Sequence, residues 1–248
     1  RDLVKDVPGK SIFVKFAVTE YKGVITKLLG TKENVYFVIW TTTTWTIPGN
    51  LAISLNPKFE YDFVKVPNGE IYVLAKELVA SVMKTAGIDS WEVLATVLGS
   101  DLELIKTKHP LFDRDSLVIT GDHVTLDAGT GCVHTAPGFG ADDFIVCQRY
   151  NIPIIVPVDG KGRHTAESGK YEGMFVDASN EVILKDLDDC GALLATEDIV
   201  HSYPHCWRCK NPIIFRTTEQ WFCSVDALKD DAVKACEDIK WIPGWGQE

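Results

Sequence analysis

Two segments that lie far apart in the chain carry most of the side chains that could do chemistry. Residues 40–50 read WTTTTWTIPGN, and residues 129–143 read GTGCVHTAPGFGADD. The first segment places a run of hydroxyls at the end of an apolar strand. The second places a histidine and two carboxylates around a loop rich in glycine and proline. Together these groups could bind a polar substrate and orient a water molecule.

The two carboxylates are predicted to lie in the first turn of a helix. A negative charge is favoured there by the helix dipole and by free backbone N–H groups. Asp143 is therefore the candidate for holding a cationic group such as an ammonium, whereas Asp142 is expected to cap the helix. The alternative is that both aspartates only cap the helix, and the residues by themselves leave both interpretations open.

The threonine run offers hydroxyls that can both donate and accept hydrogen bonds. Thr41, Thr42 and Thr43 could bind polar groups of a substrate or the attacking water. The alternative is β-propensity alone, because threonine is common in strands. Four threonines in a row place hydroxyls on both faces of a strand, which packing alone does not favour.

Two other polar residues are weaker candidates for substrate binding. His134 follows a Gly-Thr-Gly turn, where a single histidine is more often structural than functional. Asn50 follows a Pro-Gly pair and could make a polar contact or a turn. The residue types alone do not separate these roles.

Hydrophobic periodicity predicts many short strands and few helices. Alternating apolar residues over 12–18 indicate a half-buried strand. Further strands are predicted at residues 35–40, 51–55, 61–66, 71–74, 91–98, 102–106, 117–119, 124–125 and 132–134, and helices at residues 76–86, 142–149 and 179–188. These elements predict an α+β fold with a β-barrel-like sheet and short peripheral helices.

The composition limits the partners that the chain could have. Its 248 residues carry a net charge of −10, which argues against binding nucleic acid through a broad basic surface. A local basic patch could still contact a single-stranded end, although these residues could equally be scattered surface charges: Lys106, Lys108, Arg114, Arg208, Lys210 and Arg216. No apolar run approaches the ~20 residues that a membrane-spanning helix needs. A cytoplasmic monomer without a membrane partner is expected.

The seven cysteines are expected to be reduced thiols, since a chain of this size does not need disulfides for stability. Cys206 and Cys209 form the only close pair. A structural zinc site needs four ligands, and His201 and His205 could complete one. The alternative is two free thiols on a turn.

Both polar segments resemble the editing domain of isoleucyl-tRNA synthetases, which is the first connective polypeptide insertion of these class I enzymes. Tryptophan, a threonine triplet and then Trp-Thr-Ile-Pro is the pattern of that family. A third stretch is also similar, reading HSYPHCWRCK over residues 201–210 and PIIFRTTEQWF over 212–222. The resemblance covers nearly the whole chain. It implies an editing-domain body at residues 1–201 and a connector at 202–248 that returns to an absent catalytic domain.

The resemblance also assigns roles to the candidate residues. Asp143 would hold the substrate's α-ammonium group, and the three threonines would contact the ribose, the ester carbonyl or the water. Trp45 and His134 would form walls that exclude the larger correct amino acid. The chain departs from the family pattern at Thr44, where proline is usual, and at Phe139, where histidine is frequent. Support for a metal site with a second imidazole in this loop is therefore lost.

The implied activity is hydrolysis of valyl-tRNA(Ile), with valyl-adenylate as a second candidate substrate and no cofactor. Its partners would be the 3′ end of tRNA(Ile), the valine moiety and the remainder of the synthetase. The motifs of the ATP-binding site are absent from the sequence, and the start at an arginine favours an excised fragment. Two alternatives are a tRNA-end binding module with little activity, and a metal hydrolase using His134, Asp142 and Asp143.

Overall fold

The computed structural model describes residues 3–20, 23–30 and 34–247. Arg1, to which the fragment interpretation refers, lies outside these ranges. The chain divides into two compact units, one ending at Thr217 and one beginning at Thr218. Within the described ranges, no helix is long and apolar enough to cross a membrane.

The first unit is built on a single mixed sheet. Its strands are β1 (Leu3–Val18), β2 (Val35–Thr41), β3 (Ala52–Leu55), β4 (Glu60–Lys65), β5 (Ile71–Ala75), β6 (Glu92–Leu98), β7 (Lys106–Lys108), β8 (Asp115–Thr120), β9 (Val133–Thr135) and β10 (Leu193–His205). Their order is β10-β1-β7-β8-β3-β9-β2-β5-β4-β6, and β1 also pairs with β2. That extra pairing closes six of the strands into a ring, so the predicted α+β fold with a barrel-like sheet is confirmed.

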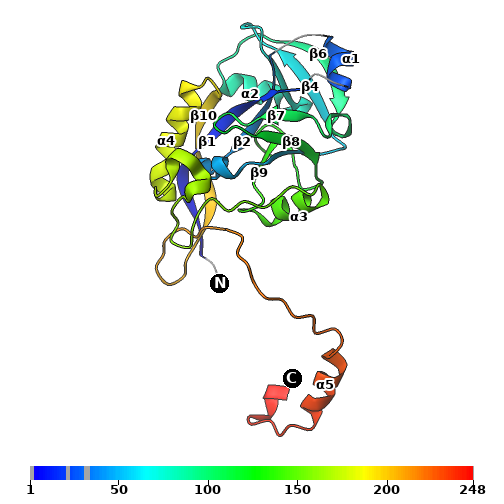
Figure 1. The fold of residues 1–248 in the computed structure, drawn as a ribbon, viewed down its shortest axis with the longest axis vertical. Coiled ribbons are helices and arrows are strands. Elements are labelled where there is room, and N and C mark those ends of the chain that lie inside the picture. The colour runs from blue at the N-terminus through cyan, green and yellow to red at the C-terminus, as the bar shows by residue number, and fades with distance from the viewer. Residues whose placement is uncertain (1–2, 21–22, 31–33, 248) are drawn as a thin grey trace. The chain divides into compact units, whose positions relative to one another are not determined.

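Short helices surround this sheet (Figure 1). They are α1 (Val24–Leu29), α2 (Val79–Thr85), α3 (Ala141–Arg149) and α4 (Val176–Asp189), with 3₁₀ helices η1 (Thr44–Gly49), η2 (Lys76–Leu78), η3 (Gly99–Leu102) and η4 (Ala166–Tyr171). The helix α4 lies beside β10, whereas α1 and α2 are seen at the opposite end of the sheet from α3 (Figure 1). The helices add buried side chains to the core that the strands form, among them Ile25 of α1 and Ile183 of α4.

Strand β1 has apolar side chains on both faces over its second half. Ile12, Val14 and Phe16 are fully buried in the main core, as the alternating pattern predicts. Phe13 is also buried, because it packs on the other side in a second cluster with residues of β2, β5 and α2. The strand is therefore covered on both faces rather than half-buried.

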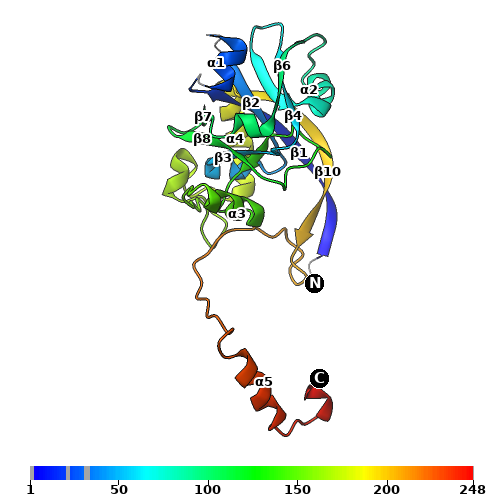
Figure 2. The same cartoon turned by 90° about the vertical axis from the view of Figure 1, so that its right-hand side faces the viewer.

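The first half of β1 extends beyond the barrel as a two-stranded arm with β10 (Figure 2). The pairing is antiparallel and runs from Leu3 opposite His205 to Val14 opposite Leu193. Periodicity did not predict β10, because its exposed residues follow no clear alternation. The boundary predicted after residue 201 falls inside this strand and stays a prediction.

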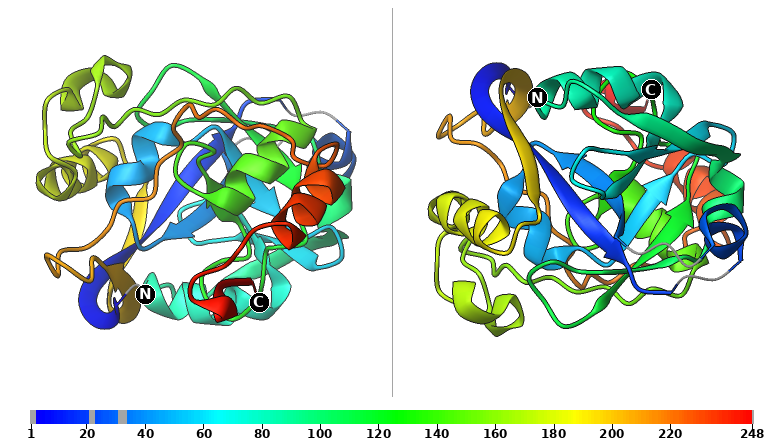
Figure 3. Two further views of the ribbon diagram at one scale, coloured as in Figure 1. Left: turned by 90° about the horizontal axis from the view of Figure 1, so that it is seen from below. Right: turned by 90° about the horizontal axis from the view of Figure 1, so that it is seen from above.

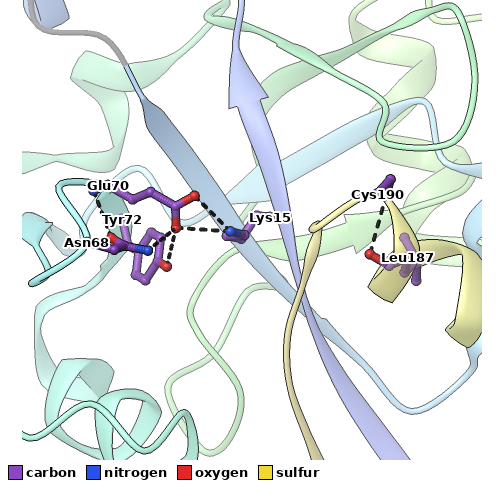
Figure 4. Close-up of polar contacts among 6 residues, drawn as sticks. All are labelled: Lys15, Asn68, Glu70, Tyr72, Leu187 and Cys190. Atoms are coloured by element: carbon purple, nitrogen blue, oxygen red, sulfur yellow. Dashed lines mark hydrogen bonds and ion pairs between the residues drawn. The ribbon is translucent and has the colours of Figure 1, made fainter.

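A half-buried polar cluster ties β1 to the start of β5 (Figure 4). Lys15 Nζ lies 2.9 Å from both Glu70 carboxylate oxygens, and the Tyr72 hydroxyl donates to Glu70 Oε2 at 2.6 Å. Burial raises the pKa of Glu70, but hydrogen bonds from Tyr72, Lys15 and Asn68 outweigh it, so the pKa lies below its usual value. The charged pair therefore stabilises this side of the sheet at neutral pH.

Most of the other predicted elements are present, with three local errors. The strand predicted at residues 102–106 is absent over most of its length, because η3 ends at Leu102 and β7 begins only at Lys106. Residues 124–125 form no strand, since they lie in a loop between β8 and β9. The helix predicted at residues 179–188 begins three residues earlier, at Val176, and the Ser179 hydroxyl donates to Val176 O inside it.

The second unit contains α5 (Lys229–Glu237) and η5 (Gly244–Gln247). Trp221 and Phe222, which precede α5, have exposed fractions of 103% and 89%. None of the α5 residues is buried. This unit therefore has no apolar core among its described residues.

Truncating the core side chain of Ile39 is expected to destabilise the barrel strongly. Ile39 is fully buried in β2, and Ile→Ala changes in such positions typically cost about 2–5 kcal/mol. The matched control is Ile154→Ala. Ile154 is 40% exposed, so its truncation should lower the free energy of unfolding much less. Urea unfolding of both variants measures the difference, and equal losses would contradict the assigned core.

Candidate functional site

The threonine-rich segment forms a buried 3₁₀ turn where β2 ends. The Thr43 N–H donates to Thr41 Oγ1 at 3.1 Å, and the Thr46 N–H donates to Thr43 O at 3.1 Å. All six residues of η1 are buried, including Trp45. Proline within a short turn needs no N–H partner, so Pro48 is accommodated there. The turn therefore holds the hydroxyls by local hydrogen bonds rather than by strand pairing.

The glycine-rich segment brings β9 against β2 and β3. Trp40 pairs with Val133, and Ile53 pairs with His134. Gly131 has a positive φ of 74°, and a Cβ there would lie 2.3 Å from the Ala75 side chain. Glycine at this position therefore allows the close approach of the segment to Ala75 of β5 just before β9 begins.

Side chains from both segments line one cavity of about 220 Å³. The residues that line it are Thr41, Thr43, Trp45, Thr46, His134, Ala136, Phe139, Asp143, Tyr203 and Phe215. Viewed from below, η1 and α3 are both seen at this end of the barrel (Figure 3). The structure thus brings together five of the predicted site residues: Thr41, Thr43, Trp45, His134 and Asp143.

Two predicted site residues do not line this cavity. Thr42 instead lines a neighbouring groove of about 1080 Å³, which shares Thr43, Trp45 and Tyr203 with the cavity. Asn50 is fully buried behind the cavity. Its role in the structure is to hold the histidine rather than to face the cavity.

His134 is fixed by hydrogen bonds at both ring nitrogens. Asn50 Nδ2 lies 2.8 Å from His134 Nδ1, and Asn50 Oδ1 accepts from Ser116 Oγ, so the amide group donates to the ring. Thr46 Oγ1 donates to Thr43 O at 2.7 Å and therefore accepts from His134 Nε2 at 3.0 Å. The imidazole is neutral with its proton on Nε2.

Burial keeps the imidazole neutral. Loss of solvent lowers the pKa of His134 to about 4, although the contact with Thr46 opposes this shift. Because Nδ1 already accepts from Asn50, His134 has no lone pair free to take a proton from a water. It can form a wall of the cavity but cannot serve as its general base in this arrangement.

Asp143 is the only carboxylate among the residues lining the cavity. Its Oδ2 accepts from the Ala136 N–H at 2.8 Å. Burial raises the pKa of Asp143, and this effect exceeds the lowering by the Ala136 hydrogen bond and by His123. The expectation that the helix terminus favours the charged form is outweighed by loss of solvent. A cation bound beside this carboxylate would reverse the shift.

Neither aspartate caps α3. The N-cap is Gly140, which makes no side-chain cap hydrogen bond, and Asp142 is exposed. The prediction that Asp142 caps the helix is wrong, because the chain enters α3 one residue earlier than expected. The interpretation in which both aspartates only cap is removed as well.

Two aromatic rings form an apolar wall of the cavity. Trp45 and Phe139 contact edge to face, with ring centroids 5.0 Å apart. Gly49 leaves room for this contact, since a Cβ there would lie 2.6 Å from the Phe139 ring. Sequence reasoning did not identify Thr46, Ala136, Phe139, Tyr203 or Phe215 as lining residues. For Thr46, Ala136 and Phe139, the only signal in the sequence was their position within the two motifs.

The remaining candidates from the sequence are a metal site, the cysteines and a basic patch. Within the described ranges, no group of three or more His, Cys, Asp or Glu side chains could hold a metal ion. All seven cysteines are free thiols. Two lysines of the suggested basic patch, Lys106 and Lys108, form ion pairs with Glu20 and Asp113.

A model of the tRNA synthetases class I (I, L, M and V) matches residues 12–248. The chain belongs to this family. It is 58% identical over 238 residues to an isoleucine–tRNA ligase of Caldicellulosiruptor saccharolyticus, covering 96% of the chain and 26% of that relative. It is 51% identical over 243 residues to that of Caldanaerobacter subterraneus subsp. tengcongensis, covering 98% and 26%. This chain thus spans about a quarter of the length of the curated relatives that it matches.

Solved structures of editing domains share the fold of this synthetase chain. The crystal structure of GlLeuRS-CP1 matches with a TM-score of 0.60 at 16% identity, covering 74% of this chain and 97% of that chain. The P. knowlesi cytosolic leucyl-tRNA synthetase editing domain matches with a TM-score of 0.56 at 12% identity, covering 78% and 96%. The chain therefore has the fold of these editing domains, and the relatives that it matches by sequence are isoleucine–tRNA ligases, in agreement with its motifs.

The neutral state of His134 predicts acid sensitivity of the fold. Burial also lowers the pKa of His109, to about 3. Because the unfolded chain binds a proton near pH 6.5 and the folded chain does not, stability falls as pH drops from about 6.5 toward these values. Each of these two histidines should lower the free energy of unfolding by about 2 kcal/mol when the pH falls from 7 to 5. Urea unfolding at the two pH values measures the loss.

Imidazole NMR gives the direct measurement on His134. Its resonance, assigned by comparison with His134→Gln, should show an Nε2-protonated neutral ring that does not titrate between pH 5.5 and pH 8. A midpoint near pH 6.5 would contradict the buried, doubly hydrogen-bonded arrangement.

Proposed function

We propose that this chain is an editing hydrolase that cleaves the ester of valyl-tRNA(Ile), with valyl-adenylate as a second substrate. The observation that carries the proposal is a half-buried carboxylate with a raised pKa, Asp143, in a small cavity lined by threonine hydroxyls. An aminoacyl ester has an α-ammonium group that would pair with this carboxylate. Binding of that cation would offset the loss of solvent around Asp143.

The threonines would orient the reacting groups. Thr41 and Thr43 face the cavity from the end of β2 and the start of η1. Their hydroxyls can donate to an ester carbonyl or position a water beside it. Thr42 faces the adjoining groove, where it would contact the ribose of the tRNA end. Catalysis would then rest on positioning and on stabilising developing charge.

Water is the nucleophile in this proposal. No serine or cysteine is among the residues lining the cavity. The two buried thiols are those of Cys132 and Cys147, and burial raises the pKa of both. Thiolates are therefore disfavoured at neutral pH, and a covalent cysteine intermediate has no support from the site.

Selection by size would follow from the rigid walls. A pocket that accepts isoleucine rejects valine by only about 1–3 kcal/mol, a limit for which isoleucyl-tRNA synthetase is itself the standard example. A second cavity that admits valine and excludes isoleucine supplies the missing discrimination. Here Trp45, Phe139 and His134 form the walls, and His134 is held at both nitrogens.

The remainder of a synthetase and the 3′ end of tRNA(Ile) would be the partners of this chain. This part of the proposal rests on the isoleucine–tRNA ligases, which are about four times as long. The runner-up is a tRNA-end binding module with little activity of its own. The net charge of −10 favours weak tRNA affinity for the chain alone. Hydrolysis at high substrate concentration separates the two.

Incubation of the chain with valyl-tRNA(Ile) and isoleucyl-tRNA(Ile) tests the proposal. The wild type should release valine faster than isoleucine, and Asp143→Ala should lower valine release at least 100-fold, because the ammonium loses its only carboxylate partner in the cavity. Asp142→Ala is the matched control, since Asp142 is exposed. Equal activity of the Asp143 variant and the wild type would refute the assignment.

The charge on Asp143 is expected to lower the stability of the fold while it supports activity. The raised pKa of Asp143 means that the folded state disfavours its charged form, so stability falls as pH rises from the ordinary carboxyl pKa through the raised value. Asp143→Asn should therefore raise the melting temperature at pH 7 while removing hydrolysis. The gain should shrink as pH falls toward the ordinary carboxyl pKa of about 3.9. A lower melting temperature at pH 7 would contradict this prediction.

A further inference from the structure

The chain segment that follows β10 is attached to the loop that forms the cavity. Ile213 N–H donates to Pro204 O at 3.1 Å, and Thr217 N–H donates to Gly138 O at 2.7 Å. The Thr217 hydroxyl also lies 3.2 Å from Pro137 O. Pro137 and Gly138 stand between Ala136, which binds Asp143, and Phe139, which packs on Trp45. The segment at residues 211–217, here called the strap, is therefore connected directly to the site.

The strap places Phe215 at the mouth of the cavity. Phe215 lines it together with Trp45 and His134, but the three side chains differ greatly in exposure. Phe215 is 56% exposed, whereas Trp45 and His134 are 7% and 8% exposed. The buried residues form the floor and walls, and the exposed aromatic ring stands where the cavity opens.

The size of the cavity indicates which part of a substrate meets this ring. A volume of 220 Å³ equals about seven waters at their volume in the liquid. That space holds a small aminoacyl group beside Asp143, but not the nucleoside to which the group is esterified. The nucleoside must then lie at the mouth. An exposed aromatic ring in that position is a stacking surface for a base, and such stacking is tolerant of sequence.

We propose that Phe215 stacks on the base of the terminal nucleoside and that Thr217 is the positioning residue that holds the strap there. The inference rests on the proposed function and assigns to this connector a direct share in substrate binding. Ile214 supports the same placement, because it packs against the cluster of Trp45, Val158 and Val176. Thr217 is also the last residue of the first compact unit. The strap is thus fixed to the barrel up to the residue at which the second unit begins.

The test compares two valine esters that differ in the nucleoside. One is 3′-O-valyl-adenosine, and the other is valine methyl ester, which has no base. In Phe215→Ala, the ratio of KM for the adenosine ester to KM for the methyl ester should rise about tenfold or more over the wild-type ratio. Phe215→Tyr should restore it, since a phenol ring also stacks. Phe222→Ala is the matched control, because Phe222 is 89% exposed in the second unit.

A second pair of variants tests the role of Thr217. Thr217→Pro removes the N–H that donates to Gly138, and it should raise the same KM ratio with a smaller effect on kcat. Thr218→Pro is its control, because no hydrogen bond of the Thr218 N–H to the barrel is among the contacts of the described residues. An unchanged ratio in both Phe215→Ala and Thr217→Pro would overturn the proposal.

Direct binding separates this inference from the proposed function. Saturation-transfer NMR with free adenosine requires no hydrolysis, so it reports on the base site even if neither ester is cleaved. Ring protons of adenosine should receive saturation from the wild type and lose most of it with Phe215→Ala. Equal saturation in both proteins would overturn the base-stacking assignment, whereas absent ester cleavage by the wild type would overturn only the hydrolase proposal.

Discussion

The hydrogen-bonded imidazole of His134 is the interaction on which the site depends. Through Asn50 on one side and Thr46 on the other, it joins the threonine turn to β9 and, by way of Ser116, to β8. His134, which makes these contacts, is only 8% exposed. Because unpaired polar atoms are costly under such burial, the network permits one ring orientation, and the shape of the cavity wall follows from it.

The barrel provides the geometry that this network requires. β2 ends at Thr41 beside β9, and β3 carries the chain from Asn50 back along the other edge of β9. Closure of the ring through the β1–β2 pairing keeps these strand ends together. Asp143 approaches from α3, outside the sheet, and is held by a single N–H of the loop. Its desolvated carboxylate is a local cost to stability that a bound ammonium would relieve, which is the usual compromise between stability and function at a binding site.

Several structural features could be predicted residue by residue, and the errors have local causes. The alternation over residues 12–18 correctly predicted a strand with Ile12, Val14 and Phe16 inside. The strand predicted at residues 35–40 is β2, but no pattern indicated that the threonines after it form a turn closed by the Thr41 hydroxyl. Asn50 was predicted to be a substrate contact, but its amide group is used entirely by Ala52, His134 and Ser116. A polar residue type does not reveal whether its partner is internal.

The sequence by itself determined the family, the α+β class and the two motifs that meet, because these depend on residue type, spacing and periodicity. Only the tertiary structure decided which side chains face the cavity, which tautomer His134 adopts and in which direction the pKa of Asp143 moves. It also placed Tyr203 and Phe215 at the site, although they lie 60 and 72 residues beyond the end of the second motif. Burial and long-range contacts set these properties. They arise from packing between distant segments, which no local pattern of residues encodes.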